Sequence, residues 1–214
     1  MNRRPHKLAW IGFCAALALA AFPSKSMAQS TMLEARMKTI LASPTATAAS
    51  IAAAKKVTFF CDACHGADGS SNKPEVPNLA AQNPSYLLTQ IDKFVHGQRR
   101  YEFMEGLMKM LTEEDRINVA VYYSSKSVRP AGTVKSDAGK TIFAARCAPC
   151  HGAQALGNEN TPRLAGQQFK YLKLSITRYR DQTGERIYAP MSAMTSVLKD
   201  QNIEDLATYL SSLN

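Results

Sequence analysis

The chain has 214 residues, of which 45% are hydrophobic, and it carries a formal net charge of +9 at pH 7. Four of its basic residues lie within the first 28 positions, so the remainder has a formal charge of only +5. A charge of that size is only weak evidence for a nucleic-acid-binding protein.

Residues 1–28 are predicted to be a signal peptide. Basic residues precede an apolar run at positions 8–22, and Ser26-Met27-Ala28 offers a small-residue cleavage site. The apolar run is short for a membrane span, which needs about 20 residues, although an uncleaved anchor is the alternative. Cleavage would remove Cys14 and place the mature chain in the periplasm, an oxidising compartment.

Residues 29–47 are predicted to form an N-terminal extension. Several apolar residues fall roughly on one helical face before Ser43 and Pro44 end the pattern. These are Met32, Leu33, Met37, Ile40 and Leu41. We interpret the segment as a short helix packed on the domain that follows, and a docking segment for a partner is the alternative.

The pattern Cys-x-x-Cys-His occurs twice, at Cys61–His65 and at Cys147–His151. With five cysteines and four histidines in the chain, about 0.002 chance matches are expected, so the pattern is informative. It is typical of covalent c-type haem attachment, in which both cysteines form thioethers and the histidine binds iron. A disulfide, a thioredoxin-like pair and half a zinc site are alternatives, but thioredoxin needs a βαβ context and zinc needs four clustered ligands.

We therefore predict two covalent haem c groups. The expected attachment residues are Cys61, Cys64, Cys147 and Cys150. The expected proximal iron ligands are His65 and His151.

Both motifs belong to an internal repeat. The haem motif recurs 86 positions later, and Pro77-x-Leu79-x-x-Gln82 recurs at an offset of 85 as Pro162-x-Leu164-x-x-Gln167. An offset of 87 relates Met104, Leu111, Ala120 and Tyr122 to Met191, Leu198, Ala207 and Tyr209. The drifting offset indicates small insertions in loops, so the chain contains two copies of one haem domain.

Each copy is predicted to be all-α. Ser136 and Asp137 begin a helix that runs into the second haem motif, and further helices are expected around 171–179 and 203–210. In the first copy, Thr112 can cap the last helix. A polar stretch broken by Pro130 and Gly132 separates the copies. We assign domain 1 to residues 48–126, a linker to 127–136 and domain 2 to 137–214.

Two tandem Cys-x-x-Cys-His domains, each with a Pro-x-Leu-x-x-Gln segment and a methionine before a final tyrosine-bearing helix, resemble the dihaem cytochrome c4 family. The resemblance runs from about Ala48 to the C-terminus, and residues 29–47 depart from it. It implies two class I cytochrome c folds, each wrapped around one haem, with the haems facing each other across the domain interface.

Methionines are the candidates for the sixth iron position, because a thioether favours ferrous iron and raises the reduction potential. The candidates are Met104, Met108 and Met110 in the first copy, and Met191 and Met194 in the second. Core packing is the alternative role for each. Only Met104 and Met191 share the seven-residue spacing to Leu111 and Leu198, and the resemblance places the family's axial methionine at these two positions.

Two further pairs are candidate site residues. The resemblance implies that the backbone carbonyls of Pro77 and Pro162 accept the proximal imidazole N–H, although either can be a simple loop proline. Arg100 and Arg186 precede the methionine segments and are candidates for pairing with haem propionates, with an exposed solubilising role as the alternative. His96 is expected to be a surface residue.

The predicted function is a periplasmic electron carrier between a respiratory donor and a terminal oxidase or other acceptor. Its expected partners are redox proteins, and peripheral membrane association is compatible with the sequence. An electron-accepting haem subunit of one periplasmic oxidoreductase is the alternative, with residues 29–47 as its dock. A dihaem dehydrogenase or peroxidase would need an open or labile iron position, and neither copy indicates one.

Overall fold

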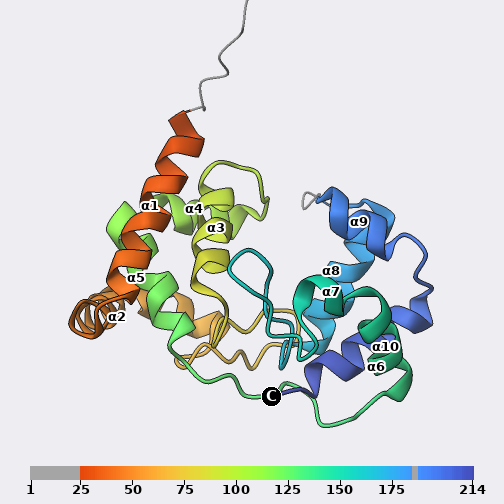
Figure 1. Ribbon diagram of the computed structural model, residues 1–214. Helices are drawn as coiled ribbons and strands as arrows, with labels where there is room; N and C mark the ends of the chain where they lie inside the picture. The colour runs from red at the N-terminus through yellow and green to blue at the C-terminus, as the bar shows by residue number, and fades with distance from the viewer. Residues whose placement is uncertain (1–24, 185–187) are drawn as a thin grey trace, which may run out of the picture.

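The computed structural model describes residues 25–184 and 188–214, so most of the predicted signal peptide lies outside the described residues. Within these ranges the chain forms helices and no strand, which confirms the all-α prediction (Figure 1). The first half contains α1 (Lys25–Leu41), α2 (Pro44–His65), α3 (Pro84–Val95), α4 (Glu102–Met110) and α5 (Glu113–Ser124). The second contains α6 (Asp137–Arg146), α7 (Ala148–His151), α8 (Phe169–Asp181), α9 (Ala189–Thr195) and α10 (Asp200–Ser211).

The internal repeat appears as two similar helical units. In each unit the last helix packs on the helix that leads into the haem motif, α5 on α2 and α10 on α6. The two helices between them also pair, α3 with α4 and α8 with α9. Figure 1 shows α1–α5 gathered in one half of the molecule and α6–α10 in the other. Each haem motif is therefore held by a long-range helix contact within its own unit.

Side-chain caps begin three of these helices, and two of the caps, at α5 and α6, lie where the sequence predicts. The Ser43 side chain accepts the Ala46 N–H at the start of α2, and the Ser136 side chain accepts the Gly139 N–H at the start of α6. Thr112 and Asp115 form a reciprocal capping box at the start of α5. Such caps satisfy N–H groups that have no partner within the helix, and each contributes roughly 1 kcal/mol.

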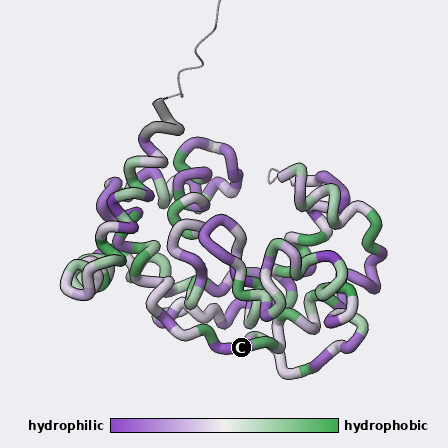
Figure 2. The backbone as a smooth tube through the Cα atoms, viewed as in Figure 1, coloured by the Kyte–Doolittle hydropathy of each residue, from purple (hydrophilic) through white to green (hydrophobic). Residues whose placement is uncertain are grey.

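Each unit has its own apolar core, because apolar residues at helical spacing face inward. In the helix predicted around 203–210, four apolar residues at helical spacing are buried: Ile203, Leu206, Ala207 and Leu210. They form one apolar core with Phe143 of α6 and Leu172 of α8. The Tyr209 ring lies 5.7 Å from the Phe143 ring, measured between centroids, so it packs α10 against α6. Figure 2 shows apolar and polar residues alternating along the helices of both halves.

The N-terminal extension forms α1, which packs on α2, α3 and α5 of the first unit. Leu33 and Met37 are buried in the core of that unit. Met32 and Leu41 are exposed, so the inward face is narrower than the five apolar residues suggested. Lys38 Nζ also lies 3.1 Å from Glu159 Oε1 of the second unit. The extension is thus an integral helix of the first unit that also touches the second.

Residues 25–184 and 188–214 include no helix with the length and apolar character required to cross a membrane.

Candidate haem sites

The first candidate site lies at the C-terminal end of α2. His65 is buried, and its Nδ1 lies 2.8 Å from the Pro77 carbonyl oxygen. If Nδ1–H donates this bond, Nε2 carries a lone pair for iron. Burial lowers the pKa of His65, which favours the neutral form that binds a metal. Cys61 and Cys64 form no disulfide, so both sulfurs are available for haem attachment.

The second site has the same arrangement on two shorter helices. His151 is buried, and its Nδ1 lies 3.0 Å from the Pro162 carbonyl oxygen. Cys147 ends α6, and Pro149 lies in the first turn of α7. Proline cannot donate the backbone bond that a continuous helix needs, so the helix is interrupted here whereas α2 is not. Burial raises the pKa of the Cys147 thiol to about 11.

A glycine directly after each histidine lets the chain turn away from the helix. Gly66 has φ +80° and Gly152 has φ +77°, a region that side chains with a Cβ rarely adopt. A Cβ on Gly66 would also come within 2.4 Å of the Ser70 carbonyl oxygen. This turn directs the loop back so that the following proline reaches the histidine.

The structure separates the candidate methionines by burial. Met104 is the third residue of α4 and Met191 is the third of α9, and both are partly buried. Met108 is 3% exposed and belongs to the core of the first unit, while Met110 and Met194 are 68% and 43% exposed. Met104 and Met191 therefore occupy equivalent positions at the start of equivalent helices.

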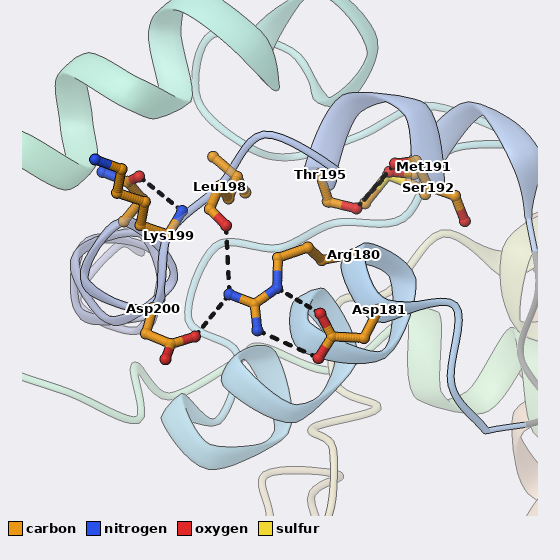
Figure 3. A network of polar contacts seen from close by, with 9 residues as sticks. Arg180, Asp181, Met191, Ser192, Thr195, Leu198, Lys199 and Asp200 are labelled. Carbon is orange, nitrogen blue, oxygen red and sulfur yellow. Dashed lines mark hydrogen bonds and ion pairs between the residues drawn. The ribbon is translucent and has the colours of Figure 1, made fainter.

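The segment carrying Met191 is tied to its neighbours by polar contacts (Figure 3). The Thr195 hydroxyl donates to the Met191 carbonyl oxygen at 2.8 Å. Arg180 of α8 pairs with Asp181 and with Asp200 of α10, both at 2.6 Å, and donates to the Leu198 carbonyl oxygen. These contacts fix both ends of the loop that joins α9 to α10.

Unsatisfied buried polar atoms indicate that both sites suit a haem. Among the described residues, four buried side-chain N or O atoms have no hydrogen-bond partner: those of Asp62, Arg116, Tyr123 and Ser192. Asp62 is inside the first motif, Ser192 follows Met191, and Tyr123 shares a core with Cys61. Such groups are rare in folded proteins and often mark a site for a missing partner.

Exposed aromatic rings lie on the same segments. Phe59 and Phe60 immediately precede the first motif, and Tyr101 and Tyr188 immediately precede α4 and α9. All four rings are at least half exposed. A haem presents a large apolar face that such rings can cover, so the residues present fit the group that the motifs predict.

The arginine pair is only partly described. Arg100 is exposed, and its Nε lies 2.9 Å from Glu105 Oε1, whereas Arg186 lies outside the described residues. The repeat places Arg99, and not Arg100, opposite Arg186. Gly97 and Gly184 both have positive φ, and each arginine follows its glycine by two positions.

Arg99 is a candidate that was not identified from the sequence, although the repeated Gly-x-Arg was a visible signal. Its guanidinium donates to Gln90 Oε1 at 2.8 Å and to the Tyr171 hydroxyl of the second unit at 3.2 Å. Arg99 thus links the segment before α4 to the other unit. His96, in contrast, is exposed, as expected for a surface residue.

The two repeated Pro-x-Leu-x-x-Gln segments meet at the interface between the units. Gln82 Oε1 accepts the Arg163 N–H at 2.7 Å, and Gln82 Nε2 donates to the Arg163 carbonyl oxygen at 2.9 Å. Gln167 forms the same two bonds with the Asn78 backbone, at 2.7 Å and 3.0 Å. Both glutamines and Asn78 are buried.

This pairing is reciprocal, because Asn78 and Arg163 are themselves equivalent residues of the repeat. The same patch of each unit contacts the same patch of the other, as in a two-fold symmetric dimer. Asn78 and Arg163 directly follow Pro77 and Pro162, whose carbonyl oxygens lie beside the proximal histidines. The interface therefore adjoins both candidate haem sites. The two glutamines are visible in the sequence as part of the repeat, but their role is apparent only from these contacts.

Comparison with known proteins gives consistent results. The cytochrome c family matches residues 136–214. Cytochrome c4 of Pseudomonas aeruginosa is 29% identical over 177 residues, which are 76% of this chain and 88% of that protein. The structure of reduced cytochrome c4 from Pseudomonas stutzeri superposes with a TM-score of 0.67 at 26% identity, covering 76% of this chain and 97% of that one.

A solved thiosulfate dehydrogenase (TsdBA) from Marichromatium purpuratum is also similar. It superposes with a TM-score of 0.62 at 29% identity, covering 72% of this chain but only 36% of the enzyme chain. The two-unit fold therefore also occurs as part of a larger redox enzyme.

Proposed function

Because the chain belongs to the dihaem cytochrome c4 family, we propose that it is an exported carrier that passes single electrons from a respiratory donor to a terminal oxidase or another acceptor. It is a c-type cytochrome with two covalent haems and acts in electron transfer. The observation that best supports a carrier is the equivalence of the two sites, each with a buried histidine held by a proline carbonyl.

The protein's own residues hold each iron and set its surroundings. Bound haem supplies the one-electron chemistry of iron. The Pro77 and Pro162 carbonyls fix the tautomer and ring orientation of His65 and His151, which also makes the imidazoles better donors. Met104 and Met191 are the proposed sixth ligands, so neither iron would bind a substrate. Burial of both histidines would keep water away from the imidazole nitrogens that bind iron.

We further propose that the signal peptide directs the chain to the periplasm, where the four motif cysteines receive haem. The proposed partners are redox proteins on either side of the carrier, with peripheral membrane association compatible with that role. The interface contacts of Gln82 and Gln167 hold the two units in one arrangement, which supports electron transfer between their haems.

An electron-accepting subunit of one oxidoreductase is the second candidate. The likeness to part of the thiosulfate dehydrogenase favours it. In that case the exposed face of α1, which includes Met32, would meet the enzyme. Affinity purification of the tagged holoprotein separates the candidates, because a dedicated subunit retains one partner in fixed ratio and a free carrier does not.

The mature protein is expected to carry two covalent haems. Each Cys-x-x-Cys-His motif supplies two thiols and a ligand, so mass spectrometry of the denatured protein should give the chain cleaved near Ala28 plus two haem masses. A Cys147→Ala, Cys150→Ala double variant is the matched control and should retain one. A wild-type mass with one haem or none would refute the two-site function.

Neither haem is expected to bind external ligands readily. With histidine and methionine on each iron, the reduced protein should bind carbon monoxide slowly or not at all, and the oxidised protein should not turn over peroxide. It should still exchange electrons rapidly with small redox proteins. Visible spectroscopy under carbon monoxide checks this, and stoichiometric binding by one haem together with substrate turnover would favour an enzyme.

A further inference from the structure

Tyr123 of α5 has a fully buried hydroxyl that lacks a hydrogen-bond partner among the described residues. Its ring packs against the loop that follows His65, where a Cβ on Gly69 would come within 2.8 Å of the ring. Its backbone carbonyl accepts the Ala81 N–H at 3.0 Å. The side chain is therefore held in one place between the last helix and the first haem motif.

The fold itself does not require a hydroxyl at this position. The equivalent residue of the second unit, 87 positions later, is Leu210, which is also fully buried. An apolar side chain can therefore fill the equivalent position of the core. The neighbouring Tyr122 does have a partner, because its hydroxyl donates to the Ala67 carbonyl oxygen at 3.2 Å. A buried hydroxyl without a hydrogen-bond partner is destabilising. The Tyr123 hydroxyl therefore needs a hydrogen-bond acceptor that the protein alone does not supply.

The sulfur of Cys61 belongs to the same buried core as this hydroxyl, and the two groups are close enough that each affects the pKa of the other. Burial raises the pKa of the Tyr123 hydroxyl well above its ordinary value, so the group stays protonated and remains a donor. Haem attachment changes the sulfur. Its S–H adds across a vinyl double bond, the hydrogen goes to carbon, and a thioether remains that can only accept.

We propose that the Tyr123 hydroxyl donates a hydrogen bond to the Cys61 thioether and thereby raises the reduction potential of the first haem relative to the second. Hydrogen bonds around a metal cofactor are one means by which a protein tunes its potential, and a donor favours the more electron-rich, reduced form. Leu210 offers no donor in the second unit, so the two otherwise equivalent sites differ here. This inference rests on the proposed attachment of haem at Cys61.

The test is a spectroelectrochemical titration of the Tyr123→Phe holoprotein. The variant keeps the ring and removes only the hydroxyl. One of the two potentials should fall, so that the reduced-to-oxidised ratio of that haem at a fixed electrode potential drops about threefold to tenfold. A tenfold change corresponds to about 59 mV for a one-electron couple. The affected haem should be the one whose potential Met104→Ala also moves.

Tyr122→Phe is the matched control, because its hydroxyl already has a backbone partner. It should leave the reduction potentials of both haems unchanged. Thermal unfolding gives a second readout: losing a real hydrogen bond lowers the midpoint in Tyr123→Phe, whereas removing an unpartnered hydroxyl leaves it unchanged or raises it.

Unmoved potentials in a Tyr123→Phe protein that carries both haems would overturn the inference and leave the carrier function intact. An equal shift in Tyr122→Phe would overturn it as well. A wild-type protein with fewer than two haems would instead refute the proposed function, so the two failures are distinguishable by mass spectrometry of the same samples.

Discussion

Met104→Ala and Met191→Ala should each abolish the near-infrared methionine–iron band of one haem and lower the reduction potential of that haem. The thioether stabilises ferrous iron, and alanine offers no ligand in its place. Axial ligation helps set potentials over a span of about 0.8 V across haem proteins, so the fall should be on the order of a tenth of that span or more. Near-infrared absorption and a spectroelectrochemical titration measure the two effects.

The other methionines provide matched controls. Met110 and Met194 are 68% and 43% exposed, so Met110→Ala and Met194→Ala should leave the band and both potentials unchanged. Met108→Ala should also preserve the band, but it should destabilise the first unit by about 2–5 kcal/mol, because this side chain belongs to the core. Loss of the band in Met194→Ala but not in Met191→Ala would show that the register of the repeat is wrong. Loss in Met108→Ala but not in Met104→Ala would show the same.

A Gln82→Ala, Gln167→Ala double variant should uncouple the two units. Each glutamine satisfies both the N–H and the carbonyl of one interface residue, Arg163 or Asn78. A buried backbone group left without a partner costs about 1–3 kcal/mol, so each substitution should cost about 2–4 kcal/mol of interface free energy after water partly replaces the amide. Differential scanning calorimetry of the holoprotein should then resolve two transitions where the wild type shows one.

Gln201→Ala is the control for this experiment, because Gln201 is exposed on α10 and is not part of the glutamine pairing at the interface. It should unfold like the wild type. The haem spectra of the double variant should keep both methionine bands, since the ligand side chains are untouched. A double variant that retains a single transition at the wild-type temperature would mean that the glutamine pairs do not hold the units together.

The sequence alone determined the features that depend on residues close together in the chain. A Cys-x-x-Cys-His motif places its three reactive side chains within about one helical turn, so its chemistry can be read without a structure. The caps at Ser43, Thr112 and Ser136 depend on an N–H only three residues away. The internal repeat showed which residues of the two copies are equivalent, so the methionines and the prolines of the two copies could be paired.

Only the tertiary structure decided the features that join distant residues. Leu33 and Met37 are buried whereas Met32 is exposed, because the first unit covers just part of the helical face that periodicity defines. The partners of Gln82 and Gln167 lie more than 80 positions away, and no local pattern specifies which backbone groups will meet there. Local hydrogen bonds and turn geometry are encoded by neighbouring residues, whereas burial and interface pairing result from how whole helices pack against one another.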